Sequence, residues 1–251
     1  MINTPNGQSV VVDMLLLMHM IALGVGLMLF GWMFYLQRRA RRQLSQALPL
    51  HTHSPAGKFH RLSNTRPAKW LAIRSVSPEA VKDALGLNHA SPCSWSEGLI
   101  TSHAFFISPR LNGWVIVTGM ALPDPSEDVD ECYVFLCTLS RKLGHLQYFH
   151  ANTDTRHHAW ARLDDGCVTR AFAWAGTTLW NQGVETLPEI EAGLKTPDYG
   201  DATANQADIE ANVVKISKLA ARWSLDPAGV RMTSIRESIG LAGESAMGES
   251  F

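Results

Sequence analysis

The feature that constrains this chain most is an almost unbroken apolar run near its N-terminus, over residues 14–36. As an α-helix, this run would be about 34 Å long, slightly more than the roughly 30 Å hydrocarbon core of a bilayer. Trp32 and Tyr35 lie near one end of the run, where aromatic rings favour the headgroup level. We therefore predict one transmembrane helix over 14–36, in a single-pass membrane protein.

The basic residues beside the run predict its orientation. Four arginines follow it at once, whereas the preceding tail, residues 1–13, holds no Lys or Arg. Basic residues favour the cytoplasmic side, so we expect a short extracytoplasmic tail and a cytoplasmic C-terminal domain. In a bacterium the lipid bilayer that it contacts would be the inner membrane. The basic residues are Arg38, Arg39, Arg41 and Arg42.

Two small residues in the run, Ala22 and Gly26, are spaced four apart. This spacing lets two transmembrane helices approach closely, because neither residue carries a bulky side chain. A homodimer formed through Ala22 and Gly26 is therefore one possible assembly.

Charge is distributed unevenly along the chain. From Met14 to Pro78 there are nine Lys or Arg residues and no Asp or Glu, whereas 13 basic residues face 22 acidic ones from Glu79 onward. The basic part lies where lipid headgroups would meet it, which disfavours nucleic acid as a partner. The acidic part favours a basic protein partner, because complementary charge steers association.

The remaining chain divides by composition into three parts. Residues 37–66 have little periodicity and read as a basic linker, and residues 67–230 hold strand and helix patterns typical of one soluble α+β domain. Residues 231–251 are rich in Gly, Ser and Glu and are predicted to be a disordered tail.

The signals within 67–230 follow the order β-α-β-β-α-β and then a further hairpin. This order predicts an antiparallel sheet with a ferredoxin-like arrangement, extended by the hairpin. An amphipathic helix beginning near Asp208 follows, and Asp226-Pro227 ends it. The first eight segments are 70–76, 78–85, 103–108, 114–118, 124–143, 146–151, 158–163 and 167–174.

One polar cluster, Asp154, His157 and His158, suggests chemistry. A His beside an Asp can act as a general base, and neighbouring histidines can bind a metal ion. Adjacent residues on a strand point to opposite faces, however, so His157 and His158 do not converge on one pocket. The sequence contains no phosphate-binding loop and no H-E-x-x-H, G-x-S-x-G or C-x-x-C motif. We therefore predict no catalytic residue, no bound metal ion and no cofactor, and we expect the protein to have a role other than catalysis.

Three aromatic residues, Trp95, Trp180 and Tyr199, fall in predicted loops, where such side chains serve as interface anchors. We therefore predict a membrane-anchored cytoplasmic protein-binding module, of an immunity or protective type. Two alternatives remain open. One is a membrane-bound hydrolase or metal-dependent enzyme that uses Asp154, His157 and His158, and the other is a structural subunit of a membrane assembly.

Overall fold

The computed structural model divides the chain into two units, Met1–His60 and Arg61–Phe251, and the strands among the described residues belong to the second. Of the first unit, only a few single residues and one run of three are described. The residues that the structure describes are 14, 16–18, 20, 24, 28, 67–74, 77–87, 89–100, 103–201, 203–230 and 239–243.

The second unit is built on one sheet of nine strands, in which every neighbouring pair is antiparallel. The strand order is β2-β9-β3-β4-β1-β5-β6-β7-β8. The strands are β1 (Lys69–Ile73), β2 (Ser91–Ser94), β3 (Phe105–Ile107), β4 (Val115–Thr118), β5 (Leu146–Ala151), β6 (His158–Asp164), β7 (Cys167–Trp174), β8 (Thr178–Gln182) and β9 (Ile239–Gly243).

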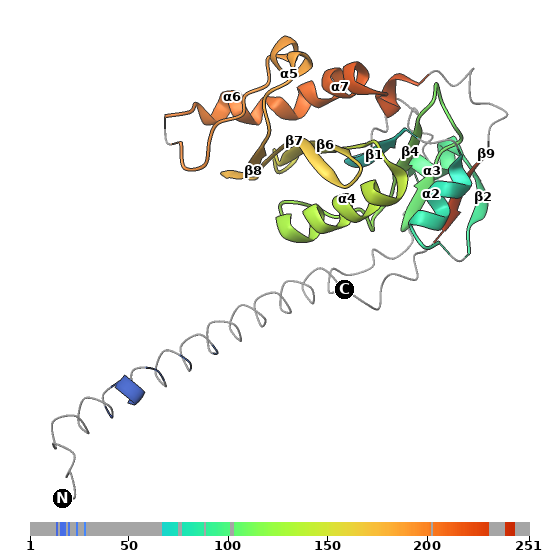
Figure 1. Ribbon diagram of the computed structural model, residues 1–251. Coiled ribbons are helices and arrows are strands. Elements are labelled where there is room, and N and C mark those ends of the chain that lie inside the picture. The colour runs from blue at the N-terminus through green and yellow to red at the C-terminus, as the bar shows by residue number, and fades with distance from the viewer. Residues whose placement is uncertain are drawn as a thin grey trace, which may run out of the picture. The chain divides into compact units, whose positions relative to one another are not determined.

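Helices cover both faces of this sheet, and Figure 1 shows α5, α6 and α7 on one face and α2 and α4 on the other. The helices are α2 (Pro78–Ala84), α3 (Trp95–Ile100), α4 (Val129–Leu143), α5 (Leu187–Ala192), α6 (Gln206–Glu210) and α7 (Asn212–Trp223). A short 3-10 helix, η1 (Pro227–Gly229), follows α7.

The two faces carry different apolar side chains, because neighbouring residues on a strand point to opposite sides. On the α2 and α4 face, the alanines at the centre of β6 and β7 leave room for α4 to pack closely. The other face is rich in large rings, among them Trp160, Phe172 and Trp174, which pack against α5, α6 and α7. This aromatic face holds the candidate site.

The predicted α+β fold class with a transmembrane helix is wrong, because the described unit is a nine-stranded antiparallel sheet with a few helices. The ferredoxin-like order plus one hairpin accounts for six strands. It omits β2, β8 and β9, which extend the sheet at both ends. These strands were missed because β2 contains Pro92, β8 ends in the polar residues Asn181 and Gln182, and β9 lies in the tail predicted to be disordered.

Among the described residues, no helix is long and apolar enough to cross a membrane. A membrane span needs about 20 consecutive, predominantly apolar residues in one helix. This finding contradicts the predicted transmembrane helix and the single-pass localisation, with its cytoplasmic domain, that was derived from it. The rest of 14–36 lies outside the described residues, as do Ala22, Gly26, the four arginines and the linker 37–66.

The helix predicted over 124–143 begins one turn later, at Val129, with Asp128 as its N-cap. The Asp128 side chain accepts a hydrogen bond from the Glu131 N–H at 2.9 Å. Asp124 instead closes a turn, since its Oδ1 accepts from the N–H and the hydroxyl of Ser126. The predicted end at Leu143, followed by Gly144, is confirmed.

The amphipathic helix near Asp208 is present as two pieces, α6 and α7, which meet at Ala211. The apolar stripe predicted for it comprises Ile209, Val213, Ile216, Ala220 and Trp223. The first four are buried on the aromatic face of the sheet, and Trp223 is partly buried there. The second piece begins with Asn212, a fully buried polar residue that takes part in the candidate site.

Candidate functional site

The aromatic face of the sheet borders a pocket of about 300 Å³ at the end where β7 turns into β8. One wall comes from that turn and the other from the chain that connects α5 to α6. The lining residues are Trp174, Gly176, Thr177, Thr178, Pro197, Asp198, Gly200, Asp201, Ala204, Gln206 and Ile209.

Trp174 reaches the pocket from the end of β7, where the pairing with β8 shifts register between Ala173 and Trp174. A register shift of this kind bends a strand and turns a side chain toward a new direction. Trp174 is 4% exposed, and its ring stacks on the His158 ring with centroids 5.4 Å apart. The pocket therefore has an aromatic wall that is supported from behind.

The opposite wall belongs to a strongly acidic part of the chain, residues 185–210, which we call the acidic segment. It contains one basic residue, Lys195, and both Asp198 and Asp201 of the pocket. Hydrogen bonds from the Thr203 side chain and backbone lower the pKa of Asp201, so its carboxylate is charged at neutral pH. The acidic residues of the segment are Glu185, Glu189, Glu191, Asp198, Asp201, Asp208 and Glu210.

Asn212 of α7 holds the acidic segment just before the pocket. Its Oδ1 accepts from the Lys195 N–H at 3.0 Å, and its Nδ2 donates to the Lys195 carbonyl at 2.7 Å. The same Nδ2 lies 3.3 Å from His158 Nε2. Because both polar groups of the Lys195 backbone are bound by one buried side chain, the position of this residue is fixed.

The protonation of His158 follows from its two neighbours. Its Nδ1 lies 2.9 Å from the Arg156 carbonyl, which can only accept, so Nδ1 carries the proton and Nε2 accepts from Asn212. Burial lowers the pKa of His158 to about 4, although the Arg156 carbonyl acts in the opposite direction. The imidazole is therefore neutral near pH 7, as the bond from Asn212 requires.

Asn181 of β8 holds the other side of the acidic segment. Its Nδ2 donates to the Thr196 and Pro197 carbonyls, both at 3.5 Å, and to Asp198 Oδ1 at 3.3 Å. Its backbone N–H donates to the Tyr199 hydroxyl at 2.7 Å. β8 is an edge strand, so Tyr199 also satisfies a donor that would otherwise face outward.

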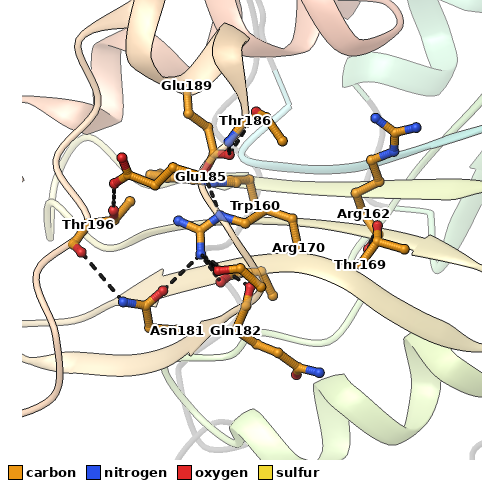
Figure 2. Close-up of polar contacts among 12 residues, drawn as sticks. Trp160, Arg162, Thr169, Arg170, Asn181, Gln182, Glu185, Thr186, Glu189 and Thr196 are labelled. Carbon is orange, nitrogen blue, oxygen red and sulfur yellow. Dashed lines mark hydrogen bonds and ion pairs between the residues drawn. The ribbon is translucent and has the colours of Figure 1, made fainter.

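A buried ion pair orients Asn181 in turn. Arg170 of β7 donates from Nε to Glu189 Oε1 at 2.8 Å and from its Nη1 to Asn181 Oδ1 at 2.8 Å. Figure 2 shows the Arg170 side chain between Glu189 and Asn181. Glu189 also accepts from Trp160 Nε1 at 2.7 Å and from the N–H and hydroxyl of Thr186, both at 2.7 Å. The pocket wall is thus connected through buried groups to β6 and β7.

The structure places the predicted anchor residues in different surroundings. Trp95 packs edge-on against Phe106 and is buried, and Trp180 is buried against Tyr133. Neither indole is available as a large exposed contact. Tyr199 is 59% exposed and lies in the acidic segment, next to Asp198.

Asp154, His157 and His158 do not form one site. Asp154 is exposed on the turn before β6, His157 is partly exposed, and His158 is buried beneath Trp174. In the part of the chain that the structure describes, no group of three His, Cys, Asp or Glu side chains is placed to hold a metal ion.

The residues that sequence reasoning missed are Trp174, Asp198 and Asp201 in the pocket and Asn181 and Asn212 behind it. The excess of acidic residues after Glu185 was a visible signal. Nothing local indicated that this segment folds back over the end of β7.

Comparison with known proteins gives no relative from which a role could be transferred. The chain matches no protein-family model, no curated protein and no solved structure.

Proposed function

We propose that this protein is a binding module that contacts a basic protein partner through the acidic segment. The observation that carries the proposal is the firm attachment of a highly charged stretch of chain to the buried Asn212 and Arg170 and the partly buried Asn181. A protein surface that is held in place before binding loses less conformational freedom on association, so more of the contact energy appears as affinity.

The composition of the surface supports a protein partner. Next to its acidic residues, the segment exposes Leu187 (66%), Ile190 (60%) and Tyr199 (59%). Leu187 and Ile190 are one helical turn apart on α5, so they lie on the same side of it. Apolar and aromatic side chains beside charged ones are the composition of a protein interface, in which the charges steer the encounter.

Binding of this kind could also protect the cell, because a module that occupies a basic surface of its partner blocks the other molecules that this surface binds. An immunity-type protein that neutralises a basic toxin is one form of this proposal. The identity of the captured partner decides whether this narrower form is correct.

The test is a crosslinking pull-down with the full-length protein at low and high salt. One variant carries Asp198→Lys, Asp201→Lys and Asp208→Lys in the acidic segment. The matched control carries Asp83→Lys, Glu127→Lys and Asp130→Lys, which change the charge equally at exposed positions on and near α2 and α4. We expect a basic partner that the wild type and the control retain, that the first variant loses, and that high salt releases.

Two results would contradict the proposal. One is a partner retained equally by the acidic-segment variant and the control. The other is the absence of any stoichiometric basic protein at low salt, across growth conditions.

A further inference from the structure

We propose that the pocket between Trp174 and the acidic segment receives a single guanidinium group, from an arginine side chain that the partner exposes. This inference rests on the proposed function and specifies which group of the partner enters the pocket. It is carried by the charge of the lining, by its aromatic wall and by its size.

The charge of the pocket selects a cation. Its lining includes two carboxylates, Asp198 and Asp201, and no Lys or Arg among the described residues. The nearest basic residue in the acidic segment, Lys195, has an exposed side chain and does not line the pocket. An anionic ligand would meet uncompensated negative charge there, whereas a cation compensates it.

The size of the pocket selects one side chain. A volume of about 300 Å³ is at the lower end of the range of ligand pockets, so it accommodates a head group and part of its stem. The exposed rim of Asp198, Gly200 and Asp201 leaves room for the partner's backbone to remain outside. A folded element such as a helix would not fit.

The aromatic wall distinguishes guanidinium from ammonium. A guanidinium is planar and weakly hydrated, so it stacks on an indole such as that of Trp174 and loses less hydration on entry than an ammonium does. It also presents donors in two directions, which suits two carboxylates on the same wall. A lysine ammonium is compact and strongly hydrated, and it binds as a point charge.

The carboxylates are held in position before any ligand arrives. Asp201 Oδ1 accepts from the N–H of Thr203 at 2.9 Å and from its hydroxyl at 2.6 Å. Asp198 Oδ1 accepts from Asn181 at 3.3 Å. Each of these bonds engages Oδ1. The neutral His158 behind Trp174 adds no positive charge that would oppose a cation.

The test uses the full-length protein and three small probes in calorimetry and NMR. They are N-acetyl-arginine methylamide, its uncharged citrulline counterpart and the corresponding lysine compound. We expect the arginine probe to bind with a dissociation constant on the order of 1–10 mM, the lysine probe several-fold more weakly, and the citrulline probe not measurably. The Trp174 indole N–H resonance, assigned by its loss in Trp174→Phe, should shift during the titration.

Variants locate the binding. Asp198→Asn with Asp201→Asn should weaken the arginine probe by about tenfold or more, whereas Asp83→Asn on α2 should leave it unchanged. Thr177→Trp fills the pocket from an exposed position and should abolish binding without removing a carboxylate. Circular dichroism checks that each variant is folded.

Equal binding of the citrulline or lysine probe, unaltered binding to folded Thr177→Trp, or no binding of the arginine probe would each overturn the inference. These outcomes are distinct from failure of the proposed function. If charge reversal in the acidic segment releases the partner while the arginine probe does not bind, the proposed binding function is supported and the arginine assignment of the pocket is wrong.

Discussion

Asn212 binds both polar groups of the Lys195 backbone, accepting from its N–H at 3.0 Å and donating to its carbonyl at 2.7 Å. These two bonds fix the chain immediately before the pocket, although 17 positions separate the residues. Asn212 is fully buried and also bonds His158 Nε2, so one side chain of α7 connects the sheet to the acidic segment.

Replacing this side chain should therefore loosen the pocket wall. We expect Asn212→Ala to lower the free energy of unfolding by about 2–3 kcal/mol, because it leaves buried groups without partners. Hydrogen exchange of residues 195–201 should also become faster. Urea unfolding and exchange mass spectrometry measure the two effects. The control is Val214→Ala at an exposed position of α7, and equal exchange in both variants would contradict the assignment.

The pair Arg170–Glu189 should show strong energetic coupling. Both side chains are buried, so removing one leaves the other charge without compensation, at a cost of about 3–5 kcal/mol. We expect Arg170→Met and Glu189→Gln each to destabilise the protein strongly. The double variant should cost less than the sum by about 1–3 kcal/mol. Additive losses in a double-mutant cycle by urea unfolding would show that the pair contributes no coupling.

The protein should become less stable as the pH is lowered from about 6.5 to about 4. Burial lowers the pKa of both His150 and His158 to about 4, whereas an unfolded histidine titrates near 6.5. In this window the unfolded chain binds more protons than the folded chain. The free energy of unfolding therefore increases as the pH rises, and it decreases when the solution is acidified.

The histidine variant that tests this dependence is His158→Phe, which keeps an aromatic ring against Trp174. We expect it to reduce the loss of stability between those two pH values by roughly 1–3 kcal/mol. Urea midpoints at several pH values, compared with those of the wild type, provide the measurement. An identical pH dependence in the two proteins would show that His158 is not the group that takes up the proton.

The four cysteines should react in a clear order with a thiol reagent. Cys167 is exposed, whereas Cys132 is fully buried and its burial raises the pKa of the thiol far above the usual range. Since the thiolate is the reactive form, Cys167 should be alkylated first and Cys132 only through unfolding. Peptide mass spectrometry after timed alkylation gives the order, and concentrated urea should make all four react alike. Early labelling of Cys132 in the folded protein would contradict its placement.

Local signals were reliable where one short stretch decides the structure. The helix α4 ends at Leu143 as predicted, since Arg141, Lys142 and Gly144 favour that end by charge and backbone conformation. The Asp165-Gly166 turn joins β6 to β7 as predicted, and both residues have positive φ angles. The start of α4 was misplaced because Asp124 and Asp128 are both capable caps, and only Asp128 is used.

Pairings between distant segments were missed for a different reason. β2 and β9 pair over Ser91–Ser94 and Ile239–Gly243, and neither segment alternates apolar and polar residues clearly. Each is short, and β2 contains a proline. A strand of this kind is stabilised by the neighbour that completes its hydrogen bonds, so its own sequence gives little indication of it.

The sequence by itself determined the elements that depend on short stretches of chain. These are α4, the strands from β3 to β7, the Asp-Gly turn and the acidic character of residues 185–210. Only the tertiary structure decided which of these elements pack against one another. Trp174 and Asp198 form one pocket because a register shift, the buried Asn212, the partly buried Asn181 and a buried ion pair bring distant segments together. A polar residue such as Asn212 is stable in the interior only when all its partners are present, and those partners are assembled by folding.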